Sequence, residues 1–321
     1  MIKTIALFDT SIATDNAGDE IIMDAVRKEL MALFPDAFYV SVPTHDTLGK
    51  IGRELARKAD LGFVGGSNLL CPNWLRHNQW KIGVKDFWRI GHPLLMGAGW
   101  VGYGREVMFP TGIMFRHLFR NKGLHAVRDS YTLNRLLKAG VSNVLNTACP
   151  TMWTLTPEHC ARLPKQKADS AVITVTGYSS SPESDGAWIK AVCDKYKTVY
   201  FWPQMVDDEP YLRSLVSGDK VVTLGANLRG YDELLKSQDV DFIGTRLHGG
   251  IRALQHGRRA IILAIDNRAT EIAKDTNFPT VSRSDIAKIS SMIDGPFETD
   301  IKIPQDKIAA WKGQFAKEPR G

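Results

Sequence analysis

The sequence predicts an α/β protein with two doubly wound, Rossmann-like domains that face each other across a cleft. Short apolar runs, typical of buried strands, alternate with helical apolar patterns in both halves of the chain. A stretch with prolines, lysines and little periodicity interrupts this alternation at residues 156–169. The length of 321 residues suits two such domains, or one large α/β unit.

These observations predict four segments. We expect an N-terminal Rossmann-like domain at 1–155, a linker at 156–169, a C-terminal Rossmann-like domain at 170–300 and a C-terminal helix or tail at 301–321. In the first half, strands are predicted near 5–8, 38–42, 61–67, 124–129 and 144–150, and helices from 16 and near 48–59, 107–120 and 130–139. In the second half, strands are predicted near 171–176, 198–202, 221–224, 240–243 and 260–265. Helices are predicted near 187–196, 209–216, 231–237, 247–256 and 306–315, with a short helix following residues 266–269.

The composition describes an ordinary globular protein that favours anionic partners. The net charge is +6 and the hydrophobic fraction 44%. The basic residues are scattered and no nucleic-acid-binding signature occurs, so nucleic acid is not an expected partner. The four cysteines lie far apart without paired histidines, which argues against a zinc site or a disulfide framework. No signal peptide or membrane span is evident, so a cytoplasmic location is expected.

The most informative stretch runs from Val240 to Gly257. An apolar strand passes through Gly244 and Thr245 into a helical pattern, with Arg246 and His248 at the turn. A helix start attracts anions through its free N–H groups and dipole, and an arginine adds a fixed charge. A histidine there can transfer protons near neutral pH. The pattern therefore favours an anion site with a proton-transfer residue, the alternative being a surface arginine and a core histidine.

Three other segments suggest site residues. Asn16 is a good N-cap for a helix in which Asp19 stands at the third position, although capping alone would also explain Asp19. Gly65 and Gly66 end a strand and allow either a close approach to a ligand or a tight turn. Arg128 ends a later strand, in a position resembling that of Arg246.

Two segments have open interpretations. Four tryptophans between residues 74 and 100 could stack on sugar rings, although core positions are commoner. Residues 107–120 combine bulky apolar side chains with Arg116, His117 and Arg120. This segment predicts either an interfacial helix that contacts anionic lipid or an internal helix with a basic outer face.

Taken together, these motifs resemble the polysaccharide pyruvyl transferase family. The resemblance rests on Asn16-Ala-Gly-Asp-Glu-Ile, Val64-Gly-Gly-Ser-Asn-Leu-Leu, Val127-Arg-Asp-Ser and, above all, Thr245-Arg-Leu-His-Gly. It implies a GT-B-like fold and transfer of the enolpyruvyl unit of phosphoenolpyruvate onto two hydroxyls of a sugar. The product is a pyruvate ketal on a cell-surface polysaccharide or its lipid-linked precursor, and phosphate is released.

The resemblance also implies roles for individual residues. His248 and Asp19 are the expected catalytic residues, with His248 as acid or base and Asp19 on the facing domain. Phosphoenolpyruvate carries a phosphate and a carboxylate, both of which suit guanidinium groups. Donor binding is expected of Arg246, Leu247, Arg128, Arg268 and Gly249, and acceptor binding of Asn16, Gly65, Gly66, Ser67 and Asn68. Phosphoenolpyruvate is a co-substrate, and neither a cofactor nor a metal is expected.

The sequence departs from the family pattern at three places. Ser67 replaces a commoner third glycine, two glycines follow His248 where bulkier residues are usual, and Arg268 stands where a lysine is frequent. Two other functions stay open. One is a sugar-nucleotide glycosyltransferase of the same architecture, for which no clear acidic ribose-binding residue follows the second-domain helix. The other is a non-catalytic glycan- or membrane-binding module. For the protein itself, a location peripheral at the inner face of the membrane also stays open.

Overall fold

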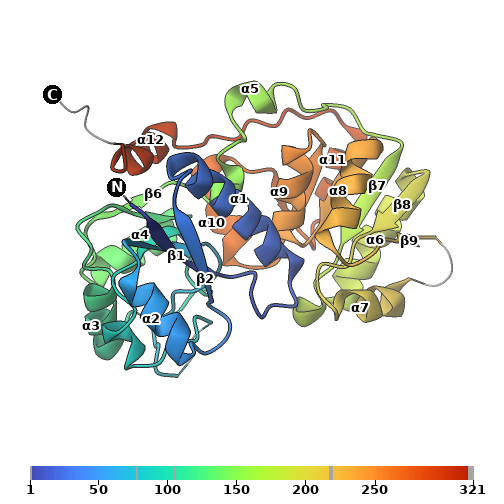
Figure 1. Cartoon of the computed structure of the whole chain (residues 1–321). Helices are drawn as coiled ribbons and strands as arrows, with labels where there is room; N and C mark the ends of the chain where they lie inside the picture. The colour runs from blue at the N-terminus through green and yellow to red at the C-terminus, as the bar shows by residue number, and fades with distance from the viewer. Residues whose placement is uncertain (1, 77–78, 105, 217–219, 317–321) are drawn as a thin grey trace. The chain divides into compact units, whose positions relative to one another are not determined.

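A computed structural model describes residues 2–76, 79–104, 106–216 and 220–316. The chain forms two compact units (Figure 1). Unit 1 comprises Met1–Thr14, Ile22–Trp153 and Ile303–Gly321, and unit 2 comprises Asp15–Ile21 and Thr154–Lys302. The predicted linker at 156–169 thus lies inside unit 2 and contains the short helix α5 (Pro157–Cys160).

Unit 1 contains a six-stranded parallel sheet in the order β2-β1-β3-β4-β5-β6. Alternate residues of β1 point to opposite faces, so that Ile5 and Leu7 belong to one buried cluster and Ala6 and Phe8 to another. Both faces are therefore covered, as the prediction of a doubly wound sheet requires. The strands are β1 (Thr4–Asp9), β2 (Phe38–Pro43), β3 (Leu61–Gly65), β4 (Leu94–Ala98), β5 (His125–Val127) and β6 (Val144–Asn146).

The helices of unit 1 cover the two faces of this sheet. They are α1 (Ala17–Leu33), whose residues 17–21 belong to unit 2, α2 (Lys50–Lys58), α3 (Phe109–Leu118), α4 (Ser130–Lys138) and α12 (Gln305–Gly313), with short 3-10 turns η1 (Asp86–Trp88) and η2 (Pro150–Met152). Helix α12, drawn in red beside β6 in Figure 1, belongs to the C-terminal segment. Its Trp311 is buried against Phe63 and Trp153, so this segment completes the core of unit 1.

Unit 2 repeats the architecture with strand order β12-β11-β10-β7-β8-β9, again all parallel. The strands are β7 (Ser170–Thr174), β8 (Thr198–Phe201), β9 (Val222–Thr223), β10 (Val240–Gly244), β11 (Ala260–Ala264) and β12 (Thr280–Ser282). The helices are α5, α6 (Pro182–Lys195), α7 (Asp208–Leu215), α8 (Leu228–Ser237), α9 (Leu247–Gln255), α10 (Asn267–Thr276) and α11 (Ile286–Asp294), and η3 spans Gly177–Ser179. The prediction of two doubly wound α/β units is confirmed.

Most of the tryptophans considered for sugar stacking belong to the core. Trp74, Trp80 and Trp100 are buried, and the Trp74 ring packs edge-on against Trp80 and Phe87. Trp88 differs, because 54% of its surface is exposed. The three buried rings therefore stabilise unit 1 and are not free to stack on a sugar.

The cysteine side chains differ in their exposure. All four cysteines are free; Cys71, Cys149 and Cys160 are buried and Cys193 is partly exposed. Burial raises the pKa of the Cys71 thiol to about 11, which keeps it protonated near neutral pH. In the part of the chain that the structure describes, no helix has the length and apolar character needed to cross a bilayer.

Candidate functional site

The junction between β10 and α9 lies at the carboxyl end of a central, fully buried strand. Strand β10 pairs with β7 on one side and β11 on the other. A Cβ atom at Gly244 would lie 2.7 Å from the backbone nitrogen and oxygen of Thr174, so only glycine fits here. The carboxyl ends of strands in open parallel sheets are the usual position of ligand sites.

Arg246 stands at the N-cap of α9, and its side chain turns away to a carboxylate. Its Nε lies 3.0 Å from Asp208 Oδ2 and its Nη2 also bonds Asp208, so the pair is bidentate. Both side chains are buried. Nη1 faces the other way and lies 3.2 Å from the sulfur of Met205. One edge of the guanidinium is thus fixed by Asp208, and the other meets only a weak acceptor.

Tyr178 links Arg246 to Arg268. The Arg246 guanidinium lies over the Tyr178 ring, 5.0 Å from its centroid, and the Tyr178 hydroxyl accepts a hydrogen bond of 2.9 Å from Arg268. Arg268 also bonds Asp266, the N-cap of α10. Burial lowers the pKa of Arg268, but Asp266 and Tyr178 outweigh it and raise that pKa above its ordinary value. The structure therefore brings two predicted donor residues together.

Each of these two arginines is balanced by a carboxylate. Asp208 neutralises Arg246 and Asp266 neutralises Arg268. An anion at this place would therefore depend on the N–H groups in the first turn of α9, which have no partner within the helix. Arg246 makes no side-chain cap hydrogen bond to that turn.

His248 and Gly249 lie in this first turn of α9, close to the sheet. Both are buried. A Cβ atom at Gly249 would lie 3.2 Å from the Phe242 ring, and one at Gly250 would lie 2.7 Å from Ile262. The two glycines after His248 thus let α9 pack closely on β10 and β11, which explains this departure from the family pattern. The Tyr231 hydroxyl donates a hydrogen bond of 2.9 Å to the Gly249 carbonyl and holds the turn.

Asn16 and Asp19 belong to unit 2, and hydrogen bonds to Gln204 hold this segment there. The Asn16 side chain caps α1 by accepting from the Gly18 N–H at 3.0 Å, as predicted, and it accepts a second hydrogen bond of 2.8 Å from Gln204 Nε2. The Ala17 N–H donates to the Gln204 carbonyl at 2.9 Å. Asp19 is buried in the first turn of α1. The start of α1 is therefore anchored to the loop after β8.

Arg128 occupies the equivalent strand-end position in unit 1 and is also buried. Its Nε lies 3.1 Å from Asp129, and its Nη2 bonds the side-chain oxygen of Asn68. A Cβ atom at Gly99 would lie 2.2 Å from the guanidinium, so Arg128 covers that glycine. Asp129 also caps α4, accepting from the Thr132 N–H at 2.6 Å. Arg128 and Asn68, predicted for donor and acceptor binding, are thus direct partners.

The glycine turn after β3 packs against α1. A Cβ atom at Gly65 would lie 2.6 Å from the sulfur of Met23, and one at Gly66 would lie 2.3 Å from Ile22 Cγ2. Gly66 and Ser67 both have positive φ, +61° and +58°. Ser67 thus adopts the left-handed conformation that a third glycine would favour. Close helix packing accounts for both glycines, and a ligand is not needed to explain them.

Three residues of the unit 2 cluster were not predicted from the sequence. They are Asp208, Tyr178 and Gln204, each of which contacts a predicted site residue. All three follow the carboxyl ends of strands β7 and β8. Their positions after predicted strands could have indicated them in the sequence, because polar residues that follow parallel strands lie at the same edge of the sheet.

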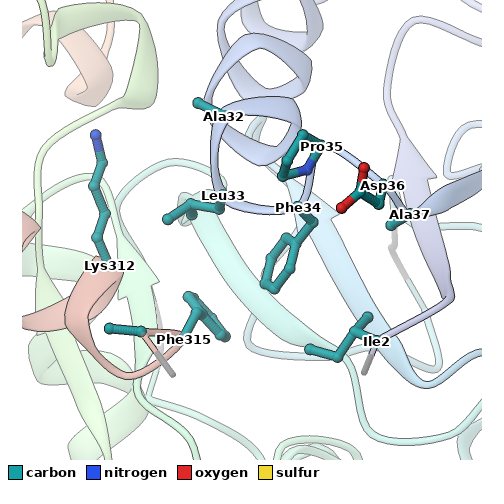
Figure 2. A pocket seen from close by; sticks show the side chains of 10 residues that line it. Ile2, Ala32, Leu33, Phe34, Pro35, Asp36, Ala37, Lys312 and Phe315 are labelled. Atoms are coloured by element: carbon teal, nitrogen blue, oxygen red, sulfur yellow. The ribbon is translucent and has the colours of Figure 1, made fainter. Parts of the chain in front are cut away.

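A separate apolar pocket of about 510 Å³ lies in unit 1 (Figure 2). The end of α1 and the α12 segment form it, and its lining includes Leu33, Phe34 and Phe315. None of the predicted site residues lines it.

Among the described residues, no group of three or more His, Cys, Asp or Glu side chains is arranged to hold a metal ion.

Comparisons with solved structures give low identities. The chain is similar to HepE from Anabaena, in complex with UDP and glucose (12% identity, TM-score 0.47, 98% of this chain and 94% of that chain). It is similar to UDP-GlcNAc 2-epimerase from Neisseria meningitidis (14%, TM-score 0.45, 91% of each chain). It is also similar to the wall teichoic acid polymerase TagF (11%, TM-score 0.45, 98% of this chain and 82% of that chain).

None of the curated proteins compared with the chain matches it significantly. The family model for polysaccharide pyruvyl transferase, in contrast, matches residues 16–267. This range begins at the cap of α1 and extends through the β10–α9 junction to Asn267. It covers most of the chain, which therefore belongs to the polysaccharide pyruvyl transferase family.

Proposed function

We propose that the protein transfers the enolpyruvyl unit of phosphoenolpyruvate to two hydroxyls of a saccharide, forming a pyruvate ketal and releasing phosphate. The acceptor would be a cell-surface polysaccharide or its lipid-linked precursor. One observation carries the proposal: within the family match, Arg246 is the N-cap of α9 and His248 lies in its first turn, at the carboxyl end of a central strand. A cytoplasmic location remains part of the proposal.

Donor binding would use the first turn of α9 together with the two arginines. The N–H groups of Leu247 and Gly249 suit a phosphate, and the helix dipole adds to the attraction. Nη1 of Arg246 and the partly exposed Arg268 suit the carboxylate. Asp208 would keep Arg246 in position, because it fixes the opposite edge of the guanidinium.

The reaction requires one proton at the methylene carbon of the donor. Protonation there converts the methylene to a methyl group, and a sugar hydroxyl adds to the adjacent carbon. Attack by the second hydroxyl closes the ketal as the C–O bond to phosphate breaks. The two hydroxyls release two protons, so one replaces the proton taken up by carbon and the other leaves with phosphate.

His248 is our candidate for this proton transfer, as the acid toward the methylene or the base toward a hydroxyl. Asp19 is proposed as the second proton-transfer group or an acceptor contact. Asn16, together with the turn from Gly65 to Asn68, is proposed for the acceptor. Arg128 is proposed for the donor, with Asn68 and Asp129 holding its guanidinium.

The test is a thermal-shift titration with phosphoenolpyruvate and a panel of nucleotide sugars. A ligand that binds the folded state stabilises it, so phosphoenolpyruvate should raise the melting temperature of the wild type. Arg268→Gln should abolish this rise, because it removes a cation proposed to bind the carboxylate of phosphoenolpyruvate. The variant should still fold, because the Arg268 side chain is partly exposed and Asp266 can still cap α10. Arg229→Gln, at an exposed site in the same unit, is the matched control.

The other possible results would refute the proposal. A response to nucleotide sugars alone would assign the site to glycosyl transfer. Binding of phosphoenolpyruvate without turnover on any saccharide, and unchanged in His248→Ala, would favour a non-catalytic binding module.

A further inference from the structure

The outer face of α3 combines exposed apolar side chains with basic ones. Phe109 and Ile113 are 78% and 41% exposed, whereas Met114, Phe115 and Leu118 are buried in the core of unit 1. Residues 109, 113 and 116 recur at helical spacing, which places Arg116 beside the two apolar side chains. We call this face, together with Trp88 of η1, the α3 surface.

Trp88 and its neighbours extend the α3 surface. Helix α3 packs on η1, and the exposed Trp88 ring lies 5.1 Å from the His117 ring. His117 also contacts His92, which accepts a hydrogen bond of 2.8 Å from Arg120 Nε. An exposed tryptophan beside cationic side chains is typical of protein surfaces that lie at a lipid–water boundary.

The part of the sequence that contains η1 and α3 has an excess of basic residues over acidic ones. Residues 74–122 contain eight Lys or Arg and two Asp or Glu, so their net charge is 8 − 2 = +6, equal to that of the whole chain. One of the two acids, Asp86, is buried and paired with Arg53. Lys85 and Arg89, which flank η1, are exposed. Exposed basic side chains therefore flank Trp88, and Arg116 lies on the exposed side of α3.

We propose that the α3 surface docks the protein onto a membrane that contains anionic lipid. Phe109, Ile113 and Trp88 would enter the headgroup region, while Lys85 and Arg89 would face the lipid phosphates. Arg116, whose Nη1 donates a hydrogen bond of 2.8 Å to the Ala139 carbonyl, adds its charge to the same face. An apolar patch alone would equally suit a second copy of the chain. The surrounding positive charge favours an anionic bilayer, because two such surfaces would repel each other.

The experiment is co-sedimentation of the full chain with vesicles of phosphatidylcholine alone or with 30% phosphatidylglycerol. We expect binding only to the anionic vesicles, and weaker binding at high salt. A basic residue near an anionic surface contributes about fivefold to partitioning, so Lys85→Gln with Arg89→Gln should weaken binding about 25-fold. Phe109→Ser with Ile113→Ser should weaken it by about tenfold or more.

The matched control is Lys190→Gln with Arg213→Gln, which removes the same charge from exposed sites in unit 2. It should change binding by less than about threefold, and the thermal unfolding of every variant verifies the fold. No binding to anionic vesicles, or an equal loss in the control, would overturn the proposal. So would a concentration-dependent dimer that Phe109→Ser abolishes, since the face would then bind a second copy. None of these measurements requires phosphoenolpyruvate, so the outcome is independent of the proposed reaction.

Discussion

Arg246 and Asp208 form a buried bidentate ion pair, although 38 residues separate them in the sequence. Asp208 also accepts hydrogen bonds from the N–H groups of Gly177, Gln204 and Met205. The carboxylate thus joins the loops after β7 and β8 to the start of α9. An arginine expected to hold the donor is therefore also a structural residue of unit 2.

Removal of Arg246 should destabilise the protein for this reason. Arg246→Ala leaves Asp208 buried without its cation, and breaking a buried pair typically costs about 3–5 kcal/mol. Urea unfolding measures this change. Arg213→Ala, which breaks an exposed pair with Glu209, should cost less than about 1 kcal/mol. If Arg246→Ala lowered the free energy of unfolding no more than Arg213→Ala does, the structural role of Arg246 would be contradicted.

Substitution of His248 should affect the reaction much more than the binding of the donor. We expect His248→Asn to lower the rate of ketal formation by about a hundred- to ten-thousand-fold, the usual range for a lost acid or base. The thermal shift produced by phosphoenolpyruvate should persist. His256→Asn, at the other end of α9, is the control and should leave the rate unchanged. Equal rates in the two variants would remove His248 from the proposed mechanism.

The sequence predicted the elements whose apolar periodicity is uninterrupted. Strands β1, β3, β10 and β11 are all found within two residues of their predicted positions, and α4 begins at Ser130, the predicted first residue of that helix. Strand β4 was missed, because Leu94–Ala98 is a short apolar run within a segment dominated by tryptophans and basic residues. Strand β12 and helix α11 were missed in a polar segment with few periodic apolar residues.

The candidate site was only partly predictable, since its pairings are non-local. Arg246 and His248 stand out because they are adjacent to a recognisable strand–helix turn. Asp208 and Tyr178 stand out only after the sheet order places β7 beside β10 and β8 beside β7. The role of Gly66 likewise depends on Ile22 of α1, which lies 44 residues earlier in the sequence (66 − 22 = 44).

Gly66→Ala should destabilise unit 1 through two separable effects. The left-handed φ of +61° costs a residue with a Cβ about 1–2 kcal/mol, and the contact with Ile22 adds about 1–3 kcal/mol. In an Ile22→Ala background the second contribution should disappear, which a double-mutant cycle in urea detects. Gly186→Ala is the control: it lies in α6 with open space around it and should stabilise the protein by about 1 kcal/mol. Additive effects of Gly66→Ala and Ile22→Ala would disprove the contact.

His125 should make the stability of unit 1 depend on pH. Its Nδ1 accepts a hydrogen bond of 3.1 Å from the Leu95 N–H, and its Nε2 lies 2.9 Å from the Phe119 carbonyl, so the ring is neutral with its proton on Nε2. Burial lowers the pKa of His125 to about 4, although the Phe119 carbonyl opposes this. In the unfolded chain a histidine titrates near about 6.5.

Between these two pKa values the unfolded chain binds the proton and the folded chain does not. The stability should therefore fall as the pH is lowered from about 6.5 to about 4, by up to about 3 kcal/mol from this residue. His125→Gln keeps a donor and an acceptor but cannot titrate, so its stability should fall less over the same range. The urea midpoints of the wild type and of His125→Gln at pH 7, 5.5 and 4.5 measure this difference in stability. The contribution of the carboxylates is the same in both proteins and therefore cancels. Parallel slopes for the two proteins would mean that His125 takes up its proton equally well in the folded chain, against the burial argument.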